Sequence, residues 1–283
     1  MSTYNYALSQ VFSPALLKRI NDPSLEATMR SLLQRCSLYE DEESWNLTKA
    51  LDITYTYLKR NYRCEYVYKN EIANQILLKL HKNNSATLLK EIASDNCIAD
   101  IVIINGTTTA YEVKTELDTF NRLPSQLESY QMIYDHLFVV TYPSAITTLS
   151  KSLSNKIGLI ALEKNGKLKT VREAKLLTDK FNPGKAVLTL RQSELVQAYQ
   201  NLDGALPQMG TAFVHRFCCN WFMTLELDVA RDLFRQCLKS RKPTNLQFDL
   251  VRRCHPSLKM MFLGRELSNK ACNLVMARLG LLE

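Results

Sequence analysis

Two short β-forming segments joined by Asn-Gly constrain the fold of this chain more than any other feature. Residues 98–104 form an apolar run rich in β-branched side chains, and residues 108–115 follow shortly after Asn105-Gly106. Asn-Gly between two β-forming runs is the strongest short-range signal for a β-hairpin. The sequence therefore predicts two antiparallel strands joined by a tight turn.

A carboxylate, Asp100, lies inside the first of these strands, where a buried and unpaired charge would be costly. If the hairpin turns about Gly106, paired residues have numbers that add up to 212, which places Glu112 opposite Asp100 with Cβ atoms about 5 Å apart. Lys114 then lies on the same face, two residues further along. Two carboxylates so close repel one another unless a cation or a proton lies between them, so removing either should leave the fold equally or more stable. A slip of one residue in register would turn Glu112 to the other face.

This cluster has a chemical use. Two carboxylates can hold a hard divalent cation such as Mg²⁺, the cation can polarise a phosphate, and a lysine can orient water and offset developing negative charge. These groups suffice for hydrolysis of a phosphodiester bond. On its own, however, a Glu-x-Lys triplet on a strand is usually a solvated ion pair.

The hydrophobic periodicity on either side of the hairpin predicts a mixed core. An amphipathic helix at 69–82 and a strand at 87–93 precede the hairpin, and a helix at 123–136 and a short buried strand at 137–141 follow it. A second hairpin is expected from 157–162 and 168–171, around Asn165-Gly166. Residues 14–62 and most of the chain after Pro183-Gly184 have helical periodicity. We expect an α/β (α+β) fold divided into a helical N-terminal region (1–62), a core (63–180) and a basic helical C-terminal domain (181–283).

The order helix, strand, Asp100, hairpin, Glu112-Val113-Lys114, helix and strand resembles the PD-(D/E)xK nuclease superfamily over about residues 66–142. The segment from Gln126 to Tyr130 is similar to the QxxxY motif of its RecB and λ exonuclease branch, and it lies in the helix after the hairpin, as in that branch. Ala99 stands where the motif has proline. The resemblance implies a restriction-endonuclease-like mixed sheet flanked by N- and C-terminal helices.

The resemblance also implies roles for individual residues. The catalytic set would be Asp100, Glu112, Lys114, Glu71, Gln126 and Tyr130. Within this set Asp100, Glu112 and Glu71 would bind Mg²⁺, for which Mn²⁺ can substitute, and Lys114 would assist the attacking water. Glu65 is an alternative source of the helical carboxylate, and Glu71 could instead be a residue that favours the start of its helix.

The formal net charge of +8 is unevenly distributed. Residues 1–142 contain 14 basic and 17 acidic side chains, whereas the remainder contains 22 and 11. A basic C-terminal part suits a polyanion such as DNA, with RNA as an alternative, although a solvated basic surface without a partner fits the charge equally well. The candidate DNA-binding residues lie along and after one predicted helix: Arg231, Arg235, Lys239, Arg241 and Lys242.

No membrane span or signal peptide is indicated, and the 8 cysteines are scattered without metal-site spacing, so we expect a cytoplasmic protein with reduced thiols. The expected function is that of a Mg²⁺-dependent nuclease acting on DNA in bacterial or phage defence, mobile-element maintenance or repair. The alternative is a catalytically inactive nucleic-acid-binding or protein-interaction factor that keeps a nuclease-like fold. A homodimer is left open.

Overall fold

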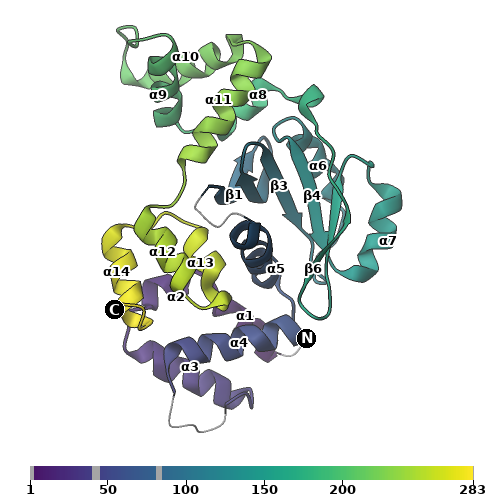
Figure 1. The fold of residues 1–283 in the computed structure, drawn as a ribbon, viewed down its shortest axis with the longest axis vertical. Helices are drawn as coiled ribbons and strands as arrows, with labels where there is room; N and C mark the ends of the chain where they lie inside the picture. The colour runs from purple at the N-terminus through teal and green to yellow at the C-terminus, as the bar shows by residue number, and fades with distance from the viewer. Residues whose placement is uncertain (1–2, 40–44, 81–84, 283) are drawn as a thin grey trace.

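A computed structural model describes residues 3–39, 45–80 and 85–282, which form a six-stranded mixed sheet with helices on both faces (Figure 1). The strands follow one another across the sheet in chain order: β1 (Thr87–Ser94), β2 (Cys97–Ile104), β3 (Thr108–Val113), β4 (His136–Thr141), β5 (Gly158–Leu162) and β6 (Leu168–Arg172). β1, β2 and β3 are antiparallel, β3, β4 and β5 are parallel, and β6 is antiparallel to β5. The expected α/β (α+β) class is confirmed.

The helices before and within the sheet region are α1 (Thr3–Gln10), α2 (Pro14–Arg19), α3 (Ser24–Arg35), α4 (Leu47–Asn61), α5 (Glu65–Ile72), the π-helix η1 (Ala73–Leu78), α6 (Leu123–Gln131) and α7 (Pro143–Ser152). The helices after the sheet are η2 (Thr178–Lys180), α8 (Pro183–Ala186), η3 (Val187–Thr189), α9 (Gln192–Leu202), α10 (Thr211–Thr224), α11 (Leu227–Ser240), α12 (Asn245–Arg253), η4 (Pro256–Leu258), α13 (Lys259–Leu263) and α14 (Asn269–Arg278). No helix among the described residues has the length and apolar character needed to cross a bilayer.

The central hairpin has the expected register. Ile101 pairs with Tyr111 and Ile104 pairs with Thr108, so the numbers of paired residues add up to 212. Gly106 has φ +72°, a left-handed conformation that glycine adopts without the steric cost of a Cβ atom. The turn chemistry therefore fixes which residues of β2 and β3 face one another, as the sequence predicted.

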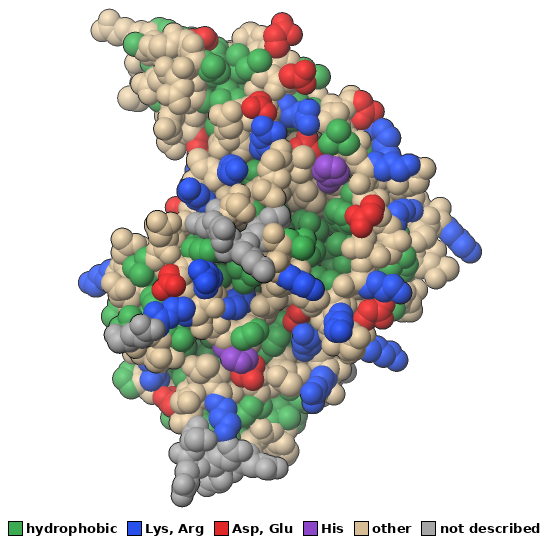
Figure 2. Space-filling view, viewed as in Figure 1, with side chains coloured by type: hydrophobic (Ala, Val, Ile, Leu, Met, Phe, Trp, Pro, Cys, Tyr) green, Lys and Arg blue, Asp and Glu red, His purple; other side chains and the backbone are tan. Residues whose placement is uncertain are grey.

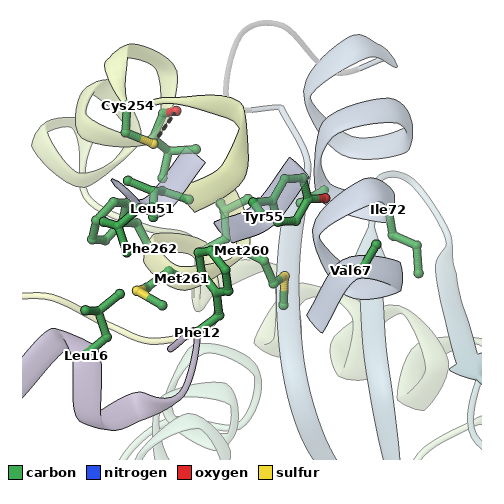
Figure 3. Packing of buried hydrophobic residues seen from close by; sticks show 14 of the residues in the cluster. Phe12, Leu16, Leu51, Tyr55, Val67, Ile72, Cys254, Met260, Met261 and Phe262 are labelled. Carbon is green, nitrogen blue, oxygen red and sulfur yellow. Dashed lines mark hydrogen bonds between the residues drawn. The ribbon is translucent and has the colours of Figure 1, made fainter. Parts of the chain in front are cut away.

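One face of the sheet packs against helices from both ends of the chain. Its core joins the N-terminal helices, α5 and helices α12–α14, and Figure 3 shows Leu51 and Tyr55 of α4 close to Met260, Met261 and Phe262 of α13. These side chains are buried because the helices at the two ends of the chain cover the same apolar face.

The other face is covered by α6, α7 and helices α8–α11. Val102 of β2 and Val139 of β4 belong to the same buried cluster as Phe222 of α10 and Phe234 of α11. Residues 181–283 are therefore divided between the two faces of the sheet. The division follows from apolar helix faces that pack on opposite sides of one sheet.

Some element boundaries differ from those predicted. The helix expected at 69–82 begins earlier, at Glu65, and becomes π-helical after Ile72; its expected last two residues lie outside the described residues. The helix expected at 123–136 ends at Gln131, and the last residue expected in it, His136, is the first residue of β4. Helix α7 is not among the predicted elements. Pro143 is its first residue, a position that proline favours, although proline within a helix usually breaks it.

Candidate functional site

The end of β3 and one face of α6 bring together four of the expected site residues. Lys114 Nζ donates to Glu112 Oε1 at 2.8 Å and to Gln126 Oε1 at 2.9 Å. The Tyr130 hydroxyl donates to the backbone carbonyl of Ile98 at 2.6 Å and lies 3.1 Å from Glu112 Oε2. Gln126 and Tyr130 are four residues apart, so both lie on the helix face that covers the sheet. Glu112 and Lys114 are only 2% and 6% exposed, so bulk water screens their charges poorly.

Asp100 lies beside this cluster, at an interruption of the β1–β2 ladder. Lys90 pairs with Ile101 and Ile92 pairs with Ala99, but no pair joins Glu91 to Asp100. Glu91 has φ +55°, which is uncommon for a residue with a side chain. Asp100 Oδ2 accepts a hydrogen bond of 2.8 Å from the backbone N–H of Val113. The Asp100 carboxylate is thereby held against β3, next to the position of Glu112.

Lys69 of α5 supplies a positive charge that the sequence did not reveal. Its Nζ lies 3.0 Å from Asp100 Oδ1, and it also forms an ion pair with Glu65, one turn earlier on the helix. The Lys69 side chain is only 3% exposed. The spacing of Glu65 and Lys69 was a visible signal of a shared helix face, but nothing local indicated that this face meets the hairpin.

Burial raises the proton affinity of both carboxyls, and a neighbouring carboxylate adds to this in each case: Asp100 at Glu112, and Glu65 at Asp100. The pKa of Glu112 lies above its usual value, chiefly because of burial and then because of the Asp100 charge, and the Lys114 contact opposes this only in part. Burial also raises the pKa of Asp100, against the attraction of Lys69. Burial lowers the pKa of Lys69, but the Asp100 and Glu65 carboxylates outweigh it and leave that pKa above its usual value. The acidic pair is therefore costly to ionise without more positive charge.

This donor set fits a hard divalent cation. Mg²⁺ is usually bound by one or two carboxylates, with water and substrate phosphates completing its shell. Asp100 and Glu112 supply two such carboxylates, and a cation between them would relieve their repulsion. Over residues 3–39, 45–80 and 85–282, no group of three or more His, Cys, Asp or Glu side chains is arranged to hold a metal ion, so these two would be the protein's main contribution.

Glu71, expected as a third metal ligand, is not brought to the hairpin. Its Oε1 accepts hydrogen bonds of 2.6 Å from both the Tyr55 hydroxyl and Lys59 Nζ. Successive residues of a helix are about 100° apart, so Glu71 is about 200° around α5 from Lys69 and faces α4. The structure therefore places Glu71 with α4 and does not bring it together with the hairpin residues. Glu65, the alternative, shares the face of Lys69 and adds to the negative potential at Asp100.

Three of the five basic residues expected to bind DNA make contacts within the protein: Arg231 Nε with Asp135 Oδ1 at 2.8 Å, Arg235 with the Gly106 carbonyl at 2.7 Å, and Arg241 Nε with Glu194 Oε1 at 2.6 Å. The Arg241 side chain is only 6% exposed. These contacts attach α11 and its C-terminal end to the sheet and to α9. Lys239 and Lys242 are exposed. The predicted basic helix is thus largely a packing element.

Comparison with known proteins identifies one family. The family model for bacteriophage P4 protein cII matches residues 58–257, which include the whole sheet and the hairpin cluster. Protein cII of Enterobacteria phage P4 is 24% identical over 219 residues, which are 73% of this chain and 80% of that protein. Among solved structures, a protein of unknown function from Silicibacter pomeroyi matches 43% of this chain and 77% of its own, at 17% identity and a TM-score of 0.33. A TM-score of this size carries no argument about fold or function.

Proposed function

The chain belongs to the bacteriophage P4 protein cII family, and we propose that it is a metal-dependent nuclease that hydrolyses phosphodiester bonds of DNA. The observation that carries this proposal is the convergence of Asp100, Glu112, Lys114, Gln126 and Tyr130 at one hairpin. The order and spacing of these residues in the sequence resemble those of the PD-(D/E)xK superfamily. The phage origin of the relative favours a role in mobile-element maintenance over one in repair.

Each residue would have a separate task. Asp100 and Glu112 would hold Mg²⁺ or Mn²⁺, which when bound would polarise the phosphate and activate water. Lys114 has three N–H donors, of which Glu112 and Gln126 accept two, so one remains to orient water or to offset charge on the phosphate. The single O–H of Tyr130 can donate either to the Ile98 carbonyl or to Glu112 Oε2, and Tyr130 would position the Glu112 carboxylate through the second of these contacts.

A second candidate function is that of a nucleic-acid-binding factor without turnover. The observation that favours it is Lys69, whose Nζ lies 3.0 Å from Asp100 Oδ1 and supplies the positive charge that a metal would otherwise provide. A fold that has replaced its metal by a lysine would retain the carboxylates for stability alone. The two candidates differ in whether the Asp100 carboxylate exchanges Lys69 for a divalent cation.

Cleavage assays separate the two candidates. Purified protein is incubated with labelled linear, circular and single-stranded DNA in Mg²⁺, Mn²⁺ or EDTA. The nuclease proposal predicts metal-dependent products. It further predicts that Lys114→Ala loses cleavage but keeps the affinity for Mg²⁺ measured by calorimetry, and that Lys114→Arg recovers little, because a planar guanidinium cannot replace a compact ammonium donor. Failure of Lys114→Ala to bind Mg²⁺ would instead indicate a structural ion pair.

A further inference from the structure

Two adjoining cavities follow the edge strand β1. The first, of about 280 Å³, lies between the α1–α2 connection, α5, β1 and α13. The second, of about 310 Å³, lies between β1, the start of α9, the segment after α11 and the loop after α13. Figure 1 shows β1 between helices α8–α11 and helices α12–α14, and Figure 2 shows the surface indented on that side between the same two groups. We call the two cavities together the edge groove.

The edge groove is continuous because its halves share residues. Lys90, Gly264 and Arg265 line both cavities. A Cβ atom on Gly264 would lie 2.9 Å from Lys90 Cδ and 3.1 Å from the Met260 carbonyl oxygen. The lack of a side chain at Gly264 therefore leaves room for the stem of Lys90 to cross between the two cavities.

The lining of the edge groove carries side chains of both charges. Its basic side chains are Lys69, Lys90, Arg191, Arg241 and Arg265, and its acidic side chains are Glu65, Glu91 and Glu266. Lys69 pairs with Asp100, Lys90 with Glu91 at 2.8 Å and Arg241 with Glu194, whereas Arg191 and Arg265 are exposed. The pair between Arg191 and Glu266, at 2.9 Å, joins side chains that are 56% and 66% exposed. Exposed pairs of this kind contribute little to stability, so Arg191 is available to a phosphate.

A buried amide fixes the shape of one wall. Gln247 is 2% exposed, and its Nε2 donates to the carbonyl oxygens of Phe262 at 2.6 Å and Arg265 at 2.7 Å. Its Oε1 accepts from the Leu267 N–H at 3.1 Å. The loop that carries Arg265 is therefore held in place before any ligand arrives, which lowers the entropic cost of binding.

One side chain, Lys69, connects the edge groove to the hairpin site. Lys69 lines the first cavity, and its Nζ is in contact with Asp100. Glu91 lines the same cavity, at the ladder interruption opposite Asp100. Phe12 and Tyr66, whose rings stack at 4.5 Å, form part of the apolar wall. Cavities near the lower limit of small-molecule pockets have room for nucleotides of one strand and not for a duplex.

We propose that the edge groove binds single-stranded DNA, with Lys90, Arg191 and Arg265 on its phosphates, and leads the strand to Asp100. This inference rests on the proposed nuclease function for its direction, but binding is measured without cleavage. It places the DNA path on the β1 edge, away from the basic face of α11.

The test compares two triple variants of the full chain. The groove variant carries Lys90→Gln, Arg191→Gln and Arg265→Gln. The matched control carries Lys167→Gln, Lys169→Gln and Lys175→Gln, three exposed lysines in and around β6 at the opposite edge of the sheet. Both variants lose the same charge. The affinity for a fluorescent single-stranded oligonucleotide is measured in EDTA at several salt concentrations.

In the groove variant, the slope of log Kd against the logarithm of the salt concentration should fall by up to about 2. Each phosphate of a single strand that a basic side chain neutralises contributes about 0.7 to this slope. Arg265→Gln alone should flatten it by about 0.7, and the β6 control should match the wild type. Unchanged slopes in the groove variant, or equal reductions in both triple variants, would overturn the proposed path. A chain that binds as predicted but cleaves nothing in Mg²⁺ would refute the nuclease function and leave the edge groove intact.

Discussion

Replacement of Asp100 tests the geometry of the site independently of any activity. Charge repulsion alone, as read from the sequence, predicts that Asp100→Ala leaves the fold equally or more stable. The structure reverses this expectation, because Asp100 Oδ2 accepts the Val113 N–H at 2.8 Å and Oδ1 lies 3.0 Å from the buried Lys69 ammonium. Alanine can make neither interaction, so we expect Asp100→Ala to be less stable than the wild type.

The comparison with Asp100→Asn isolates one of these interactions. Both variants lack the charge, and both relieve the repulsion on Glu112, but only asparagine keeps an oxygen that can accept the Val113 N–H. A buried backbone donor left without an acceptor costs about 1–3 kcal/mol. Asp100→Asn should therefore exceed Asp100→Ala by about 1–3 kcal/mol in free energy of unfolding, measured by urea titration in EDTA. Equal stability of the two variants would refute the role of Asp100 as a backbone acceptor.

Three other predictions concern stability and the boundary of the site. Because the folded-state pKa values of Asp100 and Glu112 are raised, these two groups bind protons more tightly in the folded protein than in the unfolded chain, so the metal-free stability of the wild type relative to Glu112→Gln should fall as pH rises above about 4; urea titrations in which the wild type gains stability relative to this variant would contradict this. Glu71→Gln should lose about 1–2 kcal/mol of stability, because it weakens hydrogen bonds to a buried carboxylate, while its cleavage rate stays near wild type in the same assay. Lys259→Met should lower the free energy of unfolding by about 1–3 kcal/mol or more, because Lys259 Nζ donates to three carbonyl oxygens at the end of α12. An unchanged melting temperature would show that water takes the place of the ammonium group.

The parts of the site that could be predicted from the sequence are those fixed by local rules. Asn105-Gly106 sets the hairpin turn, and the turn sets the register that brings Asp100 beside Glu112. The four-residue spacing of Gln126 and Tyr130 places both on one face of α6.

The parts that could not be predicted depend on how distant elements pack. Lys69 reaches Asp100 only because of the rotation of α5 over the sheet, and the same rotation turns Glu71 toward α4. Arg241 pairs with Glu194, 47 residues earlier, so a side chain of a type common on DNA-binding surfaces instead forms an ion pair within the protein. No local pattern encodes either contact, because each requires the arrangement of whole helices.

The nuclease proposal requires that the hairpin carboxylates, and not the carboxylate of Glu71, support metal-dependent cleavage of DNA. The decisive quantity is the initial rate of Mg²⁺-dependent cleavage by the wild type, Glu112→Gln and Glu71→Gln, on the DNA substrate that the wild type cleaves fastest. Both substitutions remove one buried negative charge from residues 2% and 4% exposed, so each is a control for the other. We expect cleavage by the wild type and Glu71→Gln and none by Glu112→Gln. Absence of cleavage by the wild type on every substrate, or equal rates for all three proteins, would contradict the proposal.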